Sequence, residues 1–265
     1  MELRGAVVAI TGASAGIGRE TALAFAREGA RIAICARRSE RLEALAEAIR
    51  AGGSECLVMQ TDVADAAQVQ RFITATLERF GRLDVLVNNA GYGVRGRVED
   101  TPLDDYERLM RVNYLGTVYG CSAAVPILRR QGRGVIINVS SIVGHRSLPG
   151  GAAYAASKAA QVSLTESLRA ELRGSGVFAC SVHPIGTQTE FAEVAAQLSA
   201  GRPGGPLGPQ QSAADVARAI VGAARRPRAE VYPYPLSRVV TWTNALLPGL
   251  MDWLAARGAK RAGRA

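Results

Sequence analysis

The stretch Thr11-Gly12-Ala13-Ser14-Ala15-Gly16-Ile17-Gly18, which follows an apolar run at residues 6–10, decides the fold of this chain. Gly12 permits a sharp exit from a strand, Gly16 lets the backbone approach a bound pyrophosphate, and Gly18 allows the next helix to pack closely. The unpaired N–H groups at the start of that helix then face the phosphates. The turn therefore predicts a dinucleotide site, and a purely structural turn is the alternative. The residues of the turn that we expect to contact the cofactor are Gly12, Ser14, Gly16, Ile17 and Gly18.

Short apolar runs alternate with longer amphipathic segments along the chain, a pattern typical of a parallel sheet covered by helices on both faces. Strands are predicted at residues 6–11, 31–36, 55–60, 84–88, 134–140, 177–183 and 230–234. Helices are predicted, among others, at residues 16–28, 39–51, 65–80, 103–130 and 152–174. The sequence thus predicts an α/β fold of the Rossmann type, a doubly wound parallel sheet of about seven strands. We expect a single dinucleotide-binding catalytic domain, residues 1–235, followed by a basic, apolar C-terminal extension, residues 236–265.

The composition is that of one large soluble domain, with 265 residues, 48% hydrophobic and 21% charged. Much of the net charge of +9 lies near the end, because residues 225–265 carry eight basic and two acidic side chains. The other arginines are dispersed and form no basic groove with interleaved aromatics, so nucleic-acid binding is not expected. Four widely spaced cysteines without a CxxC pair, and no signal-peptide pattern before the first strand, predict reduced thiols and a cytoplasmic protein.

The choice of cofactor is predicted from Ala36-Arg37-Arg38, at the end of the second strand. An acidic side chain there would accept hydrogen bonds from the ribose diol of NAD, whereas a guanidinium binds the 2′-phosphate of NADP through parallel N–H groups. We therefore expect NADP (NADPH/NADP+), bound by Arg37 and Arg38. The alternative is that both arginines are a solvated helix start.

Several further motifs follow in order along the chain. They are Asp62-Val63, Asn88-Asn89-Ala90-Gly91, Asn113, Ser141 after the apolar run at residues 135–139, and Tyr154 with Lys158 four residues later. Together with the glycine turn they resemble the short-chain dehydrogenase/reductase family over about residues 4–235. The resemblance implies an oxidoreductase that transfers a hydride between a nicotinamide and a carbonyl or secondary alcohol, and a homodimer or homotetramer.

In this resemblance the catalytic residues are Asn113, Ser141, Tyr154 and Lys158. Hydride transfer to a carbonyl carbon leaves an alkoxide that must receive a proton, and Tyr154 is the expected donor. A free phenol has a pKa of about 10, so a nearby cation must stabilise the phenolate, and Lys158 lies one helical turn away. Ser141 is expected to polarise the substrate oxygen. Asn113 matches the residue that positions a water linking the lysine to solvent.

The resemblance also implies further cofactor contacts, to the adenine, the adenosine ribose and the nicotinamide. They are Asp62, Val63, Asn89, Ala90, Gly91, Thr187 and Thr189, with Tyr154 also at the cofactor and Lys158 also at the nicotinamide ribose. For Asp62 the alternative is a helix N-cap, a role that fits Asp65 better. Ile185 departs from the family pattern, because a glycine usually follows the proline at this point. A shifted pocket wall is therefore expected there.

His145 and His183 are the only histidines of the chain. Neither is paired in the sequence with a carboxylate or another metal-ligating neighbour, so we expect no histidine mechanism and no metal. His145 either borders the substrate pocket or is a solvated loop residue.

The substrate pocket is expected between residues 143–148, residues 92–98 and the segment after Thr189, and this mixture favours a medium or large apolar substrate. Residues 239–256 carry both tryptophans and several leucines and are followed by cations, which is typical of a basic amphipathic membrane-surface anchor. Packing of this tail on the core, on a partner subunit or on the substrate cleft is the alternative that we favour. Pro248-Gly249 argues against a membrane-spanning helix.

Residues 200–209, rich in glycine and proline, are predicted to form a mobile loop at a place where a lid would be useful. Two other functions share the motifs described above. One is a 3-oxoacyl thioester reductase of lipid synthesis, and the other is a non-catalytic nucleotide-binding scaffold that keeps the fold.

Overall fold

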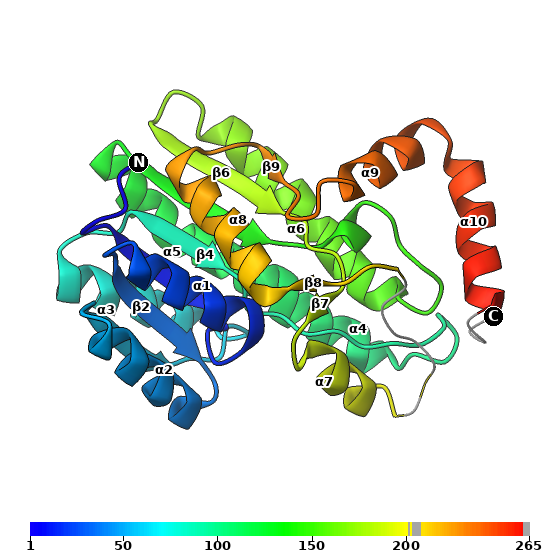
Figure 1. The fold of residues 1–265 in the computed structure, drawn as a ribbon, viewed down its shortest axis with the longest axis horizontal. Coiled ribbons are helices and arrows are strands. Elements are labelled where there is room, and N and C mark those ends of the chain that lie inside the picture. Colours follow the sequence, from blue (N-terminus) through cyan, green and yellow to red (C-terminus); the bar gives the residue numbers. More distant parts are fainter. Residues whose placement is uncertain (201, 203–207, 262–265) are drawn as a thin grey trace.

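A seven-stranded parallel sheet forms the centre of the molecule, and helices cover both of its faces (Figure 1). The computed structural model describes residues 1–200, 202 and 208–261. The strands of this sheet are β1 (Val7–Thr11), β2 (Arg31–Ala36), β3 (Cys56–Gln60), β4 (Val85–Asn88), β5 (Gly134–Val139), β6 (Val177–Val182) and β9 (Glu230–Val231). Two short strands, β7 (Thr187–Gln188) and β8 (Gln211–Ser212), pair with each other apart from it. The helices are α1 (Gly16–Arg27), α2 (Ser39–Ala51), α3 (Ala66–Phe80), α4 (Leu103–Leu109), α5 (Gly116–Gln131), α6 (Ala152–Glu171), α7 (Phe191–Leu198), α8 (Ala213–Arg225), α9 (Ser237–Leu246) and α10 (Pro248–Arg261).

The strand order β3-β2-β1-β4-β5-β6-β9 confirms the predicted doubly wound fold. The chain runs outward from β1 through β2 and β3, then crosses to the other side of β1 at β4, and every neighbouring pair is parallel. The connections therefore diverge between β1 and β4, which leaves a crevice at the carboxyl ends of these strands. β9 ends at Val231, earlier than the predicted strand 230–234, and Pro233 has no N–H to continue the ladder.

The sheet is buried on both faces, which is why its central strands are nearly continuous apolar runs. On one face, side chains such as Ile10 and Ile34 pack with α1, α2 and α8 around the fully buried Phe25. On the other face, Ile136 and its neighbours pack with α3, α5 and α6 around Phe72. These two cores fix the sheet and, with it, the positions of the loops at its carboxyl edge.

The helix predicted at residues 103–130 is interrupted. A π-helical turn, η1 (Met110–Leu115), separates α4 from α5 and carries Asn113. The carbonyl of Asn113 accepts a hydrogen bond from the Thr117 hydroxyl at 2.9 Å. Single π-helical turns occur frequently at functional sites because they displace one side chain from the regular helical register. The amphipathic period does not reveal this interruption, since the burial pattern continues across it.

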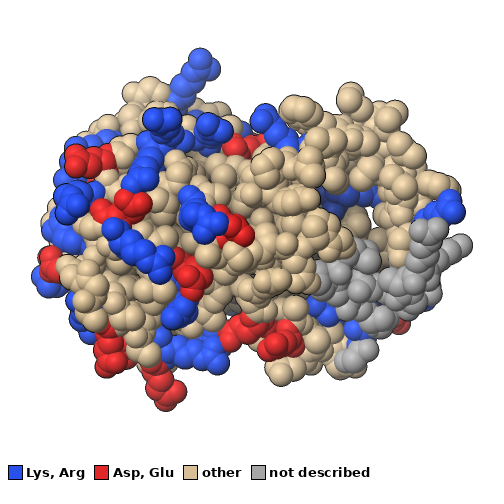
Figure 2. Space-filling view, viewed as in Figure 1, with Lys and Arg blue, Asp and Glu red and all other residues tan. Residues whose placement is uncertain are grey.

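The C-terminal residues form two helices that stand out from the sheet domain (Figure 1). α9 extends away from the core and α10 turns back after Pro248, so the two helices make a bracket beside the carboxyl edge of the sheet. Arg146 holds this bracket, because its guanidinium bonds Asn244 at 3.2 Å and Asp252 at 2.8 Å. Charged side chains dot the sheet domain in Figure 2, whereas the visible face over α9 is largely uncharged.

In the described part of the chain, no helix has both the length and the apolarity needed to cross a membrane. The predicted loop at residues 200–209 falls mostly outside the described residues, which include only 200, 202, 208 and 209 of that segment. Arg202 is described, and its guanidinium forms an ion pair with Asp105 on α4 at 2.9 Å.

Candidate active site

The glycine turn presents backbone, without side chains, at the carboxyl end of β1. Gly12 and Gly16 have φ angles of 68° and 53°, a region that L side chains rarely adopt. A Cβ atom at Gly12 would lie 2.6 Å from Cα of Ala90, and one at Gly18 would lie 2.4 Å from the carbonyl oxygen of Gly12. Only glycine fits these positions. The start of α1 consequently opens on a cradle of N–H groups that fits the pyrophosphate of a dinucleotide.

The end of β4 is bound to the glycine turn by Thr11 and Asn89. The Thr11 hydroxyl accepts hydrogen bonds from the backbone N–H groups of Asn89 and Ala90, both at 3.1 Å. The Asn89 side-chain amide donates to the carbonyl oxygens of Thr11 at 3.0 Å and Gly12 at 3.2 Å. The turn through Gly91 is therefore fixed beside β1, at the switch point of the sheet.

A cavity of about 970 Å³ opens over this edge of the sheet. Sixteen of the residues predicted from the sequence line it. They are Gly12, Ser14, Gly16, Ile17, Arg37, Arg38, Asp62, Val63, Asn89, Ala90, Gly91, Ser141, Tyr154, Lys158, Thr187 and Thr189. The two others, Gly18 and Asn113, lie behind the lining, where Gly18 packs under the glycine turn.

Lys158 is buried within α6, with 3% of its surface exposed. Its ammonium nitrogen donates to the carbonyl oxygen of Val139, at the end of β5, at 2.9 Å and to Oε1 of Gln161 at 2.8 Å. It also lies 5.8 Å from the ring centroid of Tyr154, one turn earlier on α6. These contacts connect α6 to the end of β5 and hold the amine near the tyrosine ring.

Ser141 follows β5 and lines the same cavity as Tyr154. Its hydroxyl donates to the carbonyl oxygen of Pro184 at 3.3 Å and accepts from the backbone N–H of Val143 at 3.4 Å. Ser141, Tyr154 and Lys158 are thus brought together from two elements that are adjacent in the fold.

The pKa values of these groups follow burial. Burial raises the pKa of the Tyr154 hydroxyl well above its ordinary value of 10, and a hydrogen bond with Ser141 acts in the opposite direction. Burial alone lowers the pKa of the Lys158 amine to about 7. The sequence predicts that Lys158 lowers the pKa of Tyr154, but burial outweighs any such effect here. The Lys158 nitrogen donates its hydrogen bonds to Val139 and Gln161. Burial disfavours the charged forms of both Tyr154 and Lys158.

Asn113, on η1, forms hydrogen bonds to two other segments of the site. Its side-chain carbonyl accepts from the backbone N–H of Tyr92 at 3.0 Å, and its amide donates to the Tyr92 carbonyl at 3.0 Å and the Ser157 hydroxyl at 2.9 Å. A Cβ at Gly91 would lie 3.0 Å from Asn113 Oδ1. The carboxamide therefore joins the loop after β4 to α6, while the predicted water-positioning role stays a prediction.

Two arginines and a glutamate lie at the mouth of the cavity. Arg38 donates to the Ser14 hydroxyl at 3.2 Å and 2.9 Å and forms an ion pair with Glu190, which also pairs with Arg41. The hydrogen bond from Arg38, followed by that from Arg41, lowers the pKa of the Glu190 carboxyl, while burial opposes them. Arg37 forms no ion pair with any of the described residues, and its side chain is exposed at the rim of the cavity.

The segment after β6 forms the nicotinamide side of the predicted site. The Thr187 hydroxyl donates to the carbonyl of Ile185 at 2.9 Å, and the Thr189 hydroxyl accepts from the N–H of Phe191 at 3.2 Å. Ile185 lines the cavity, and the Pro184 carbonyl before it accepts from Ile142 N–H at 3.0 Å as well as from Ser141. The residue that departs from the family pattern therefore lies on the cavity wall.

The end of β3 leads into α3. The Asp62 carboxylate accepts from the backbone N–H of Ala64 at 3.0 Å, and Asp62 and Val63 line the cavity. Asp65 is the N-cap of α3 and accepts from Ala67 and Gln68 at 2.8 Å and 3.1 Å. The prediction that Asp65 suits the N-cap role better than Asp62 is confirmed.

Further lining residues come from the predicted segment after Thr189 and from the C-terminal helices. The ring of Phe191 packs on Tyr154 with centroids 5.5 Å apart. From the C-terminal helices and the segment before them, Tyr234, Leu236, Val240, Met251 and Leu254 line the cavity. The aromatic and leucine residues of this segment indicated an apolar surface. They did not show that the chain turns at Pro248 and brings α10 back to the cavity.

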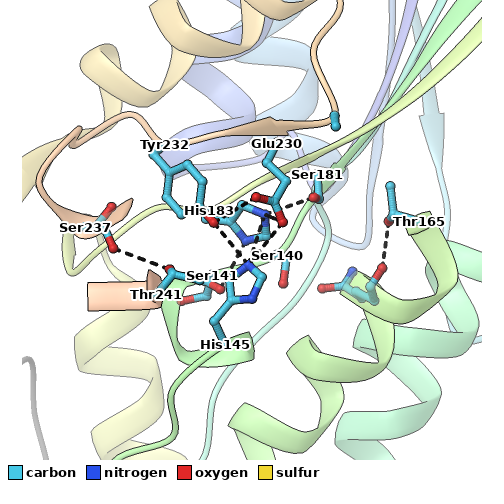
Figure 3. Close-up of polar contacts among 12 residues, drawn as sticks. Ser140, Ser141, His145, Thr165, Ser181, His183, Glu230, Tyr232, Ser237 and Thr241 are labelled. Carbon is cyan, nitrogen blue, oxygen red and sulfur yellow. Dashed lines mark hydrogen bonds and ion pairs between the residues drawn. The ribbon is translucent and has the colours of Figure 1, made fainter. Parts of the chain in front are cut away.

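The prediction that neither histidine pairs with a carboxylate is wrong. His145 and His183 lie together, with ring centroids 4.4 Å apart, and both face Glu230 at the start of β9 (Figure 3). Sequence reasoning missed this cluster because its members come from three segments that are distant along the chain. The parallel pairing of β6 with β9 places Glu230 opposite Ser181, two residues before His183.

The doubly wound sheet, the glycine turn and the tyrosine and lysine on one helix agree with the predicted class of dinucleotide-dependent oxidoreductases. A family model for short chain dehydrogenase matches residues 6–198. Dehydrogenase/reductase SDR family member 7B of Bos taurus is 34% identical over 270 residues, which cover 98% of this chain and 83% of that protein. The chain belongs to the short-chain dehydrogenase/reductase family and is an oxidoreductase.

Two solved structures are similar over most of their length. A short-chain dehydrogenase/reductase from Burkholderia phymatum in complex with NAD is 30% identical, with a TM-score of 0.85 and coverage of 94% of this chain and 96% of the other. An alcohol dehydrogenase from the archaeon Thermococcus sibiricus complexed with 5-hydroxy-NADP is 30% identical, with a TM-score of 0.76 and coverage of 86% and 95%. The family thus supports a nicotinamide cofactor.

Proposed function

We propose that this chain is an NADP(H)-dependent reductase or dehydrogenase that acts on the carbonyl or secondary alcohol of a medium or large apolar substrate. The observation that carries the proposal is that Ser141, Tyr154 and Lys158 face one cavity together with the glycine turn. A bound nicotinamide supplies or accepts the hydride. The side chains of the cavity supply the proton and the polarisation.

Tyr154 is proposed to donate its hydroxyl proton to the substrate oxygen in the reduction and to remove it in the oxidation. Its raised pKa makes it a protonated phenol at neutral pH, which is the form needed to donate. Ser141 is placed to hydrogen-bond the same oxygen as negative charge develops on it. A phenolate formed at Tyr154 attracts a positive charge, so the nearby Lys158 amine, with its pKa of about 7, gains a proton readily as the tyrosine loses its own.

NADP is proposed over NAD because two guanidinium groups stand at the end of β2. Arg37 is exposed at the rim, and Arg38 bonds the Ser14 hydroxyl inside the glycine turn. A 2′-phosphate can accept parallel N–H groups from such a pair, whereas no carboxylate stands at these two positions to accept from a ribose diol. Asp62 and Val63 are proposed to contact the adenine, and Thr187 and Thr189 the nicotinamide carboxamide.

An apolar substrate is proposed because the part of the cavity wall formed by α7, α9 and α10 is made largely of hydrocarbon. Phe191 and Val194 on α7, Val240 on α9, and Met251 and Leu254 on α10 form this wall. Burial of apolar surface contributes about 25 cal/mol per Å², so such a wall favours substrates with a sizeable hydrocarbon part.

The experiment that tests the function is oxidation of NADPH and NADH by the purified chain over a panel of aldehydes, ketones, steroids and 3-oxoacyl thioesters. Tyr154→Phe is the paired variant, because it removes one hydroxyl and keeps the ring that packs on Phe191. Turnover that needs the hydroxyl and prefers NADPH supports the proposal, and the best substrate distinguishes a general carbonyl reductase from a 3-oxoacyl thioester reductase. Tight NADPH binding with no turnover on any member favours the non-catalytic scaffold instead.

The extension predicted at residues 236–265 is proposed as a unit distinct from the catalytic domain at residues 1–235, and its described residues 236–261 are proposed to close the substrate side of the cavity. The same helices expose Trp242 and Trp253, at 57% and 55%, with Arg238 and Arg257 over their rings. This arrangement keeps open the contact with a membrane surface expected from the sequence. Co-sedimentation of the full chain with anionic vesicles, lost on deletion of residues 238–265, would support that contact; a full-length chain that stays in the supernatant would exclude it.

A homodimer or homotetramer in the cytoplasm is proposed as the working form of the enzyme. All four cysteines are free thiols. Burial raises the pKa of Cys35, Cys121 and Cys180 to about 12, so they stay protonated and unreactive. Such thiols suit a reducing compartment. Light scattering coupled to size exclusion measures the number of subunits.

A further inference from the structure

Three segments bring ring nitrogens and a carboxylate to one point beside the active site (Figure 3). His145 follows the short helix η2 (Ile142–Gly144), His183 follows β6, and Glu230 begins β9. The N–H of His183 donates to the carbonyl of Val231 at 2.8 Å, which continues the β6–β9 pairing and fixes the two backbones relative to each other. The cluster is therefore built on the edge of the sheet and on the loop that carries Ser141.

The distances between the three ligand atoms are close to those around a tetrahedral metal ion. Nε2 of His145 lies 3.4 Å from Nε2 of His183 and 3.6 Å from Oε1 of Glu230, and Nε2 of His183 lies 3.9 Å from the same oxygen. Bonds of about 2.0–2.1 Å from Zn²⁺ to nitrogen and oxygen, at tetrahedral angles, separate neighbouring ligand atoms by about 3.3–3.4 Å. Small side-chain movements bring the longer two distances to this spacing.

The protonation state of His183 suits a ligand. The side chain is fully buried, and Nδ1 faces the carbonyl oxygen of Ser141 at 3.5 Å, so a proton on Nδ1 leaves a lone pair on Nε2. The Ser181 hydroxyl lies 2.9 Å from Nε2, and a metal ion would replace it as the partner of that lone pair. Metal-binding histidines commonly donate their second ring N–H to a carbonyl in this way.

The charge balance of the cluster also favours a cation. Among the described residues, the carboxylate of Glu230 contacts the two histidine rings and forms no ion pair with a lysine or arginine. A divalent ion between two imidazole nitrogens and a carboxylate would attract the negative charge of the carboxylate and the lone pairs of both rings. The Tyr232 hydroxyl, 3.0 Å from Glu230 Oε2 and 3.4 Å from His145 Nε2, borders the remaining side.

We propose that His145, His183 and Glu230 bind one divalent transition-metal ion, with Zn²⁺ the best match to two imidazoles and one carboxylate. A mixed nitrogen and oxygen ligand set of this kind suits Zn²⁺ more than the all-oxygen sites of Mg²⁺ or Ca²⁺. A water or the Tyr232 hydroxyl completes the coordination.

The role of the ion at this place is structural. His183 contacts the carbonyl of Ser141, and the Asn244 side chain on α9 donates to the carbonyl of His145 at 3.1 Å. A bound metal therefore links the loop of the catalytic serine with the strand that leads into α9 and α10. The described residues that line the cavity include none of the three ligands, so the ion stands outside the reacting atoms.

The test is a titration of the full-length chain, free of any histidine tag, with Zn²⁺ by calorimetry, together with NMR of the histidine ring nitrogens. The chain contains only two histidines, so both ring signals can be followed individually. We expect one ion per chain, a shift of both Nε2 signals on binding, and a higher melting temperature. Co²⁺ in place of Zn²⁺ is expected to give the visible absorption of a tetrahedral site.

Two variants make the test specific. Glu230→Gln, which is nearly isosteric, and His145→Ala are expected to weaken binding about tenfold or more. Asp252→Asn, which alters a nearby carboxylate on α10 that pairs with Arg146, is the matched control and keeps the wild-type affinity. All of these variants retain the four cysteines, so metal uptake that persists unchanged in His145→Ala is thiol binding and overturns the proposal. Far-ultraviolet circular dichroism of each variant checks that it folds.

Absence of saturable binding of Zn²⁺, Co²⁺ and Ni²⁺ by the wild-type chain also overturns the proposal. Ring signals of both histidines that do not shift with any of these ions are the matching result by NMR. Both results are independent of turnover, so they do not depend on the proposed substrate.

Discussion

Glu190 forms an ion pair with Arg38 across the mouth of the cavity, and this contact ties the start of α7 to the end of β2. Arg38 is one of the two guanidinium groups proposed to bind the 2′-phosphate of NADP. Its hydrogen bond to Glu190 is the main reason that the pKa of this carboxyl is lowered, so the glutamate stays ionised at neutral pH. The carboxylate and a phosphate would therefore compete for the same N–H groups.

Glu190→Gln is expected to tighten NADPH binding about two- to fivefold, because a partly exposed ion pair of this kind contributes at most about 1 kcal/mol. NADH, which has no 2′-phosphate, should bind almost unchanged. Quenching of protein fluorescence by each cofactor measures both affinities. Glu193→Gln, on the exposed side of the same helix, is the matched control. Weaker NADPH binding in Glu190→Gln would show instead that the glutamate is needed to hold α7 over the cofactor.

Arg37→Ala is expected to weaken NADPH binding by about tenfold to a hundredfold, since hydrogen bonds to a charged group contribute about 1.5–3 kcal/mol each. NADH binding should change little, so the ratio of the two affinities is the quantity to measure. Arg50→Ala, in the last turn of α2, removes one positive charge without altering the rim. Equal losses for both cofactors would contradict a specific contact between Arg37 and the 2′-phosphate.

Features that depend on neighbouring residues in the chain were predictable from the sequence. The glycine turn, the seven strands and the pairing of Tyr154 with Lys158 on one helix are local patterns, and the structure places them as expected. The interruption at η1 was not predictable, because it leaves the apolar period unchanged. The contact of Glu230 with the two histidines depends on β9 pairing with β6, which no local pattern encodes.

The sequence predicted the position of Lys158 but not its pKa. The sequence placed a cation near the tyrosine, but the degree of burial is a tertiary property that lowers the pKa of the amine to about 7 from an ordinary value of 10.5. Between these two values the unfolded chain binds a proton that the folded chain does not. The free energy of unfolding must therefore rise with pH over this window.

Lys158→Met tests this linkage in the cofactor-free protein. From pH 7 to pH 9 the unfolding free energy of the wild type should increase by about 2 kcal/mol relative to that of the variant, given 1.36 kcal/mol per pH unit for one proton. Urea unfolding at several pH values measures the difference, and the thiols, whose pKa values are raised in both proteins, cancel in the comparison. A difference that stays constant with pH would show that the amine remains charged in the folded protein.

The apolar wall contributed by α10 leads to a prediction on substrate length. Leu254 lines the cavity, so Leu254→Ser should raise KM about tenfold for substrates with a long hydrocarbon part, which corresponds to the roughly 1.5–3 kcal/mol obtained by burying a leucine side chain. Short aldehydes or ketones, which do not reach α10, should keep their KM, and kcat should change little because Tyr154 and Ser141 are untouched. Trp253→Ser is the control on the same helix, since Trp253 is 55% exposed and stands outside the cavity lining among the described residues. If both variants raise KM equally, α10 acts through its general attachment to the domain, and the hydrocarbon contact at Leu254 is not what selects the substrate.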